Sequence, residues 1–174
     1  DKLHNNPFTF LHVINPKGGR HLPYGKVKYQ MVKKCFEDFT GEGTFHQDEK
    51  PGFYLYRQVK EGNEYIGLIA AVAVEDYFGG KIRKHEKTLT HREKMFTDSL
   101  EVTGFNVEPV LLTYKDDLRL DQLFARYITQ RSEYEFTSTD RVLHQLWLVQ
   151  DEDDIKRISK VFEDQEALYI ADGH

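Results

Sequence analysis

The chain has 174 residues, of which 39% are hydrophobic and 30% are charged, and this composition indicates a globular protein and excludes disordered, collagen-like and coiled-coil chains. Its 24 Lys and Arg residues and 29 Asp and Glu residues give a formal net charge of −5, which disfavours non-specific binding to nucleic acid. No apolar run approaches the roughly 20 residues of a membrane-spanning helix, and the single cysteine, Cys35, cannot form an intramolecular disulfide. We therefore expect a single cytoplasmic domain over residues 1–174, with no membrane partner.

Both ends of the chain indicate a longer protein. The sequence starts at Asp1 without an initiator Met, and it shows no signal-peptide pattern. At the other end, a predicted apolar strand over residues 167–171 is followed by Asp172, Gly173 and His174, where a turn into a helix would begin. We expect the chain to be a fragment.

The first half of the chain predicts three strands and a helix. Pro7–Asn15 alternates apolar and polar side chains and predicts a strand, whereas Lys26–Phe39 has apolar residues at helical spacing. Gly52–Lys60 and Glu64–Val74 are typical of strands and flank a short turn that contains Gly and Asn. We expect these two strands to pair as an antiparallel hairpin within a mixed sheet.

Two tyrosines, Tyr54 and Tyr56, alternate on one face of the first hairpin strand. Aromatic residues on a sheet can stack nucleic-acid bases, but packing across neighbouring strands is the commoner reason for them. We assign these tyrosines to packing of the sheet.

The second half alternates helices and strands. A polar stretch leads into a helix through Met95, Phe96 and Leu100, and an acidic start marks the helix Asp151–Phe162. The other predicted elements are the strand Val107–Tyr114, the helix Leu118–Ile128, the strands Tyr134–Phe136 and Val142–Val149, and the strand Ala167–Ala171. The order predicts an α/β or α+β fold, with a mixed sheet, a β-hairpin and packed helices.

The tripeptide Lys84-His85-Glu86 is a candidate acid–base cluster. A carboxylate beside an imidazole and several cations stays ionised and can take a proton from a hydroxyl group, which activates an alcohol as a nucleophile. The alternative is a solvated start of a helix, where Lys, His and Glu are common. The pattern itself leaves both interpretations open.

The tripeptide Asp172-Gly173-His174 is a candidate binding turn. Gly lets the backbone approach a ligand closely, and the N-terminus of a following helix would favour a phosphate group. The alternative is an ordinary turn after a strand. Two strand-end clusters form one site only where their strands end at the same side of a sheet, so we expect His85 or Glu86 to lie within one small-molecule length of Asp172.

Seven segments, in order and over essentially the whole chain, resemble the bacterial "domain of unknown function 1015" family. They are FLHVINP, YLYRQV, IGLIAAVAVEDY, IRKHEKT, PVLLTY, HQLWLVQDEDDI and ALYIADGH. The resemblance implies a longer protein, with ALPYDV-like sequence upstream and ADGHHR continuing downstream. The present chain lacks the Arg that would follow in that motif.

The KHE and DGH tripeptides also resemble, more distantly, the ParB/sulfiredoxin superfamily and its archaeal free-serine kinase branch. This resemblance implies ParB/sulfiredoxin-like features of the fold. It makes Glu86 the catalytic base with His85 beside it, and it makes Asp172, Gly173 and His174 a phosphate-binding turn. It also implies a serine kinase or a phosphoserine phosphatase.

The function expected from these patterns is phosphoryl transfer on a small hydroxy amino acid, serine or phosphoserine, with Mg²⁺ and ATP or ADP as cofactors. Lys84 is the cation assigned to the phosphate, among the available cations Lys17, Arg83, Lys84 and Lys87. An alternative is a noncatalytic nucleotide- or nucleic-acid-binding ParB-like module, although the acidic balance disfavours DNA. A metal hydrolase is a third alternative, but the scattered histidines show no metal-ligand spacing, so we assign no metal ligand.

Overall fold

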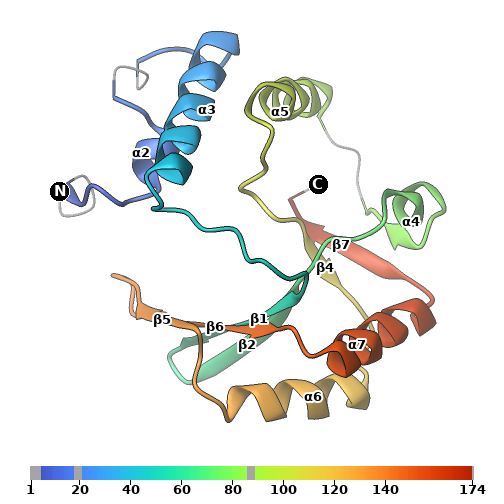
Figure 1. Cartoon of the computed structure of the whole chain (residues 1–174). Coiled ribbons are helices and arrows are strands. Elements are labelled where there is room, and N and C mark those ends of the chain that lie inside the picture. The colour runs from blue at the N-terminus through green and yellow to red at the C-terminus, as the bar shows by residue number, and fades with distance from the viewer. Residues whose placement is uncertain (1–4, 18–20, 86–88, 174) are drawn as a thin grey trace. The chain divides into compact units, whose positions relative to one another are not determined.

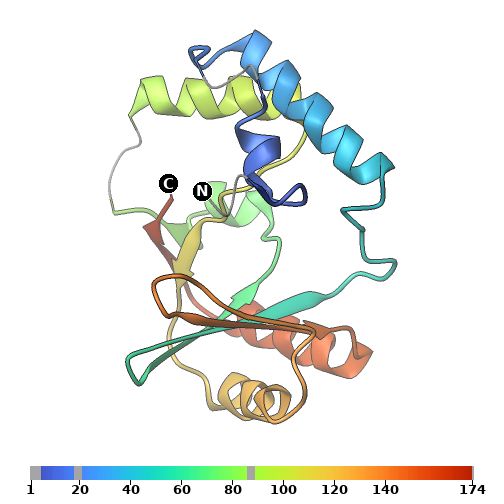
Figure 2. The ribbon, with the colours of Figure 1, turned by 90° about the vertical axis from the view of Figure 1, so that its left-hand side faces the viewer.

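The computed structural model describes residues 5–17, 21–85 and 89–173. The chain forms two compact units, each described here by itself: residues 1–48, 86–110 and 173–174 make the first, and residues 49–85 and 111–172 make the second. Over the described residues the fold is mixed α/β, as expected, with one antiparallel and one mixed sheet (Figures 1 and 2). No helix in the described part of the chain is long and apolar enough to cross a membrane.

The first unit is helical. The helices that the structure describes there are α2 (Leu11–Ile14), α3 (Lys26–Gly41) and α5 (Thr90–Thr103). The helices α3 and α5 contact each other, and the Tyr29 hydroxyl of α3 donates to the Met95 carbonyl of α5 over 3.3 Å. The predicted helices at residues 26–39 and around Met95 are therefore confirmed.

The strand predicted over Pro7–Asn15 is wrong, because this segment forms turns and the short helix α2. The Asn6 side chain accepts the Phe8 N–H and the Asn6 carbonyl accepts the Thr9 N–H, which closes a local turn. Val13 is fully buried whereas Phe8 is exposed. The apolar alternation therefore does not correspond to two faces of a strand.

The second unit contains a four-stranded antiparallel sheet in the order β2-β1-β6-β5. Its strands are β1 (Phe53–Lys60), β2 (Asn63–Ile69), β5 (Tyr134–Thr137) and β6 (Leu143–Val149). The predicted hairpin is confirmed, since β1 and β2 pair around the two-residue turn of Glu61 and Gly62 (Figure 1). Two details of the prediction are wrong: β2 ends at Ile69, and the sheet that holds the hairpin is wholly antiparallel.

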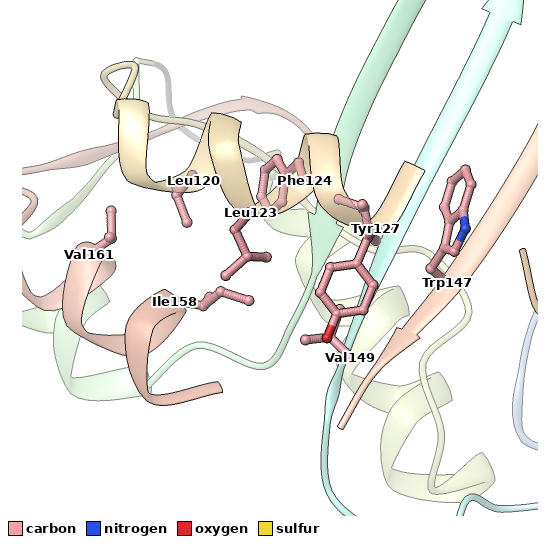
Figure 3. Packing of buried hydrophobic residues seen from close by; sticks show 9 residues of the cluster. Leu120, Leu123, Phe124, Tyr127, Trp147, Val149, Ile158 and Val161 are labelled. Atoms are coloured by element: carbon pink, nitrogen blue, oxygen red, sulfur yellow. The ribbon is translucent and has the colours of Figure 1, made fainter. Parts of the chain in front are cut away.

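Two helices, α6 (Leu118–Ile128) and α7 (Glu152–Asp164), pack on one face of this sheet. Both begin at an aspartate whose side chain accepts backbone N–H groups, Asp117 for α6 and Asp151 for α7. The buried cluster is formed by side chains of α6, α7, β1 and β6, and Figure 3 labels those of α6, α7 and β6. Burial of one such side chain stabilises the fold by roughly 1.5–3 kcal/mol, against about 0–1 kcal/mol for an exposed ion pair. This apolar cluster is therefore the main source of stability in the unit.

The opposite face of the four-stranded sheet carries the predicted tyrosines. The Tyr56 hydroxyl lies 2.6 Å from Nδ1 of His144 on β6, and it accepts a hydrogen bond from the Gln58 side chain over 2.8 Å. The His144 ring also stacks on Phe136 of β5, with centroids 4.6 Å apart. Tyr56 thus makes the cross-strand contacts expected of a packing residue.

A smaller three-stranded sheet in the order β3-β7-β4 completes the second unit. Its strands are β3 (Ile82–Arg83), β4 (Leu111–Thr113) and β7 (Leu168–Asp172), and the short helix α4 (Val74–Phe78) precedes it. The final strand is confirmed, whereas β3 and α4 were not expected. The strand predicted over Val107–Tyr114 is shortened to β4, because Pro109 offers no N–H group to a ladder and Val107 and Val110 are exposed.

Asp154 provides a test of how α6 and α7 are joined. The residue is only 4% exposed, and its carboxylate accepts hydrogen bonds from the Arg126 guanidinium and, over 2.9 Å, from the Tyr127 hydroxyl. Burial acts to raise the pKa of Asp154, but these two hydrogen bonds, together with the positive charges of Arg126 and Arg157, outweigh it and the pKa lies below its ordinary value. The charged carboxylate is therefore stabilised by folding.

We expect Asp154→Asn to lower the free energy of unfolding by about 1–3 kcal/mol near neutral pH, measured by urea denaturation. Because the folded-state pKa is depressed, this stabilisation is complete above the unfolded-state pKa of about 3.9 and is lost as the pH falls through the folded-state pKa. The difference between the two proteins should therefore shrink in acid. The matched control is Asp153→Asn, at an exposed neighbour, and a pH-independent difference would contradict the assignment.

Candidate functional site

The candidate site lies where β3 and β7 end. These strands pair in parallel, with Ile82 opposite Leu168 and Arg83 opposite Tyr169. Because parallel neighbours end at the same edge of a sheet, the residues that follow Arg83 reach the same edge as the last residues of β7. The structure therefore brings the sequence around His85 next to the strand that ends at Asp172.

Among the candidate residues that the structure describes, His85 has a defined contact with β7. Its Nδ1 atom lies 3.0 Å from the backbone carbonyl of Ile170, two residues before Asp172. A carbonyl oxygen only accepts, so Nδ1 must carry the proton. In the neutral imidazole the lone pair is then on Nε2.

The cation assigned to phosphate, Lys84, is directed to helix α4 in this structure. Its Nζ donates to the Tyr77 hydroxyl over 3.1 Å and lies 5.4 Å from the centroid of the same ring. The preceding Arg83 lies near Tyr169 and Glu166, at 3.4 and 3.5 Å. Lys84 is exposed, so its flexible side chain can exchange Tyr77 for an anion at small cost.

Tyr77 and Tyr169 were not among the predicted site residues. Tyr77 belongs to α4, a helix that the sequence patterns did not indicate. Tyr169 lies in the predicted last strand, where the burial of Leu168 and Ile170 leaves it on the opposite, half-exposed side. Strand alternation was therefore a signal that could have placed Tyr169 on the surface of the sheet.

Asp172 and Gly173 follow each other at the end of β7. Asp172 is exposed and is paired with Leu111 of β4 in the ladder. Gly173 has φ 78°, and a Cβ atom there would meet the Pro109 carbonyl oxygen and Val110 Cα at 3.4 Å. Both the conformation and the close approach favour glycine at this position.

Glu86 and His174 lie outside the residues that the structure describes. Their assigned roles, as catalytic base and as part of the phosphate-binding turn, stay predictions. Lys87 lies outside the described residues as well.

Other chemistry in the described chain is limited. No three His, Cys, Asp or Glu side chains within residues 5–17, 21–85 and 89–173 gather where they could hold a metal ion. The pKa of the Cys35 thiol is raised, first by burial and then by Asp38, which favours the unreactive thiol. Two hollows of about 580 and 520 Å³ have linings that include none of Lys84, His85 and Asp172.

A family model with the description "Protein of unknown function (DUF1015)" matches residues 1–174, the whole chain. No curated protein matches the chain. No solved structure matches it either. The family-level resemblance is confirmed, and no comparison shows a relation to the ParB/sulfiredoxin superfamily.

The hydrogen bond to Ile170 makes the tautomer of His85 testable. Free imidazole side chains in water favour a proton on Nε2, but we expect neutral His85 to carry it on Nδ1, because the main chain of β7 accepts there. The ring nitrogen shifts in the NMR spectrum of the labelled chain measure this, with exposed His46 as the reference. An Nε2–H tautomer at His85 would contradict the proposed orientation of the ring.

Proposed function

Since the chain belongs to the DUF1015 family, whose function is unknown, we propose its function from the site itself: phosphoryl transfer on a small hydroxy amino acid, serine or phosphoserine. One observation carries the proposal. The ring of His85 is oriented by the carbonyl of Ile170, in the strand that ends at Asp172 and is followed by Gly173. A positioned imidazole beside a glycine-containing turn is a combination that proton transfer and phosphate binding both use.

In the kinase direction the serine hydroxyl loses its proton to Glu86. The hydroxyl oxygen then forms a bond to the γ-phosphorus of ATP, the bond from that phosphorus to the bridging oxygen breaks, and ADP leaves. In the phosphatase direction water is the nucleophile, and serine leaves from the phosphoserine phosphorus with a proton. His85, with its lone pair on Nε2, is placed beside Glu86 in the sequence and serves as the second acid–base group.

The phosphate would be held by the turn Asp172-Gly173-His174 and by Lys84. The left-handed conformation of Gly173 lets its backbone come close to an anion, and Lys84 supplies positive charge. The Asp172 carboxylate would repel phosphate directly, so this residue would contribute through its backbone, and the substrate's Mg²⁺ would offset the charge of its side chain. The ion would neutralise charge on the phosphate oxygens.

The competing proposal is a noncatalytic module that binds a nucleotide at the same turn. It needs the phosphate-binding residues but no proton transfer. Binding without turnover in the experiment below would favour this module. If the chain does turn over substrate, the compound that is converted, serine or phosphoserine, shows whether it acts as a kinase or a phosphatase.

We expect Glu86→Gln and His85→Gln each to lower turnover by about 10²-fold or more, because a positioned acid–base group is lost while the size of the side chain is nearly kept. The assays use serine with ATP and Mg²⁺, and phosphoserine with Mg²⁺ alone. Substrate binding, measured by calorimetry, should change much less because the phosphate contacts remain.

The matched control is His46→Gln, which changes an exposed histidine in the first unit. It should leave both turnover and melting temperature unchanged, since exposed substitutions shift stability by less than about 0.5 kcal/mol. An active wild-type chain in which Glu86→Gln has full turnover would exclude Glu86 as the base. No turnover and no binding of any of these compounds by the wild-type chain would overturn the proposal.

A further inference from the structure

Strand β2 forms an edge of the four-stranded sheet that lacks the usual protection. It runs for 7 residues in continuous register with β1, without a bulge, a proline or a lysine. Natural edge strands use these devices, or short length, to avoid pairing with another chain. The other edges among the described strands are shorter, with 4 residues in β5, 2 in β3, and 3 in β4, which also carries an irregularity.

The side chains of β2 are mostly apolar and accessible. Tyr65 is 62% exposed, Ile66 40% and Ile69 43%. The one charged residue of the strand, Glu64, forms an ion pair with Arg57 of β1. The edge therefore presents no unpaired charge to an approaching strand.

The hairpin turn determines which backbone groups point outward. Glu61 and Gly62 both have positive φ, 51° and 82°, as in the two-residue turns whose flanking residues form a hydrogen-bonded pair. The direction of hydrogen bonding alternates along an antiparallel strand, so Asn63 and every second residue after it bond to β1. The remaining residues turn their N–H and C=O groups to the open edge: Glu64, Ile66 and Leu68.

We propose that β2 is a self-association edge, where β2 of a second copy of this chain pairs antiparallel to it about a two-fold axis at Ile66. In this register the two Ile66 residues exchange N–H···O=C bonds with each other. Glu64 of each copy bonds in the same way to Leu68 of the other. The two four-stranded sheets then form one continuous sheet.

The open space above Gly67 is the reason to infer that the strand pairing with β2 comes from a second copy of this chain. A Cβ atom built on Gly67 meets no atom of residues 5–17, 21–85 and 89–173 within 4 Å, so the space over its backbone is open as far as these residues go. In the proposed register Tyr65 of the second copy lies opposite Gly67, in the kind of pair where side chains approach most closely. An aromatic ring laid over a glycine is an established way to stabilise it in a sheet.

The charges agree with the same register. Glu64 of each copy lies opposite Leu68 of the other, so no like charges face each other across the two-fold axis. Each strand thus supplies both the ring and the vacant position that receives it. An unrelated extended peptide would have to match this pattern by its own sequence.

The first test is the oligomeric state of the whole chain, measured by analytical ultracentrifugation over a concentration series. We expect a concentration-dependent dimer that Ile66→Pro weakens about 10-fold or more, because both copies lose an N–H donor at the axis. Proline is tolerated at this position since the N–H group does not bond to β1. The matched control Ile66→Thr keeps the N–H donor and should weaken the dimer much less, and circular dichroism checks that each variant folds.

A second variant acts on the dimer and on folding in opposite directions. Gly67→Val fills the open space above the backbone and favours the strand conformation, so the melting temperature of the monomer should stay or rise. The same side chain occupies the position of the second copy's Tyr65, so the dimer should weaken. A variant that simply unfolds would lower both quantities, which keeps the two explanations apart.

The register itself is tested by cross-linking in a Cys35→Ser background. The chains Tyr65→Cys and Gly67→Cys, when mixed, should form a disulfide between the two copies, because directly opposite residues of this kind have Cα atoms about 4.5 Å apart. Neither variant alone should form it efficiently. A chain that stays monomeric up to its solubility limit would overturn the proposal and would indicate that β2 pairs with a segment of a different protein. A dimer whose dissociation constant is unchanged by both Ile66→Pro and Gly67→Val would also overturn it.

Discussion

One pair of aromatic rings joins the two sheets of the second unit, and the candidate site depends on it. Tyr114 and Phe162 meet edge to face, with centroids 5.1 Å apart and planes at 73°. Both rings contact the large cluster between the antiparallel sheet and helices α6 and α7, and both also contact the small cluster of Ile82, Leu168 and Ile170. Burial, and then nearby Asp121, raises the pKa of Tyr114, so its ring stays neutral in this position.

The three-stranded sheet is too small to hold its shape by apolar burial alone. Its strand β3 has 2 residues and its cluster has three buried side chains. Strand β7 therefore depends on the packing of Phe162 of α7 against this cluster and on main-chain hydrogen bonds to its neighbours in the sheet. One of these joins the Leu168 N–H to the Lys81 carbonyl over 2.8 Å. The site edge is therefore a small extension of a larger and better packed layer.

The His85 contact differs in kind from the other contacts at this edge. A main-chain carbonyl of β7 is fixed by the ladder, so the ring takes its orientation from the sheet rather than from the rotamer of a second side chain. Lys84 and Arg83 rest against exposed side chains, and such contacts contribute about 0–1 kcal/mol. The edge thus combines one fixed ring with movable cations, which suits a site where a charged ligand binds and leaves.

Much of the second unit could be predicted from local sequence because its signals are local. In α6, Leu120, Leu123 and Phe124 recur at helical spacing, and in α7 the capping Asp151 and the acidic first turn mark the start. The β1–β2 hairpin follows from two alternating runs around a two-residue turn. In each case the residues that determine the element lie within a few positions of one another.

Only the tertiary structure decided the elements whose partners are distant in the chain. Residues 7–15 alternate like a strand, yet no strand in the described part of the chain pairs with them and Asn6 closes a turn instead. The short strand β3 is too short to show a periodic pattern of apolar residues. It forms because its backbone pairs with that of β7, some eighty-six positions later in the chain. Sequence patterns could name Lys84, His85 and Asp172 as candidates, but that His85 is oriented by Ile170 follows from the parallel pairing of β3 and β7. Such a pairing depends on which apolar faces are left to bury after the local elements have formed, and this is a property of the whole unit rather than of any segment.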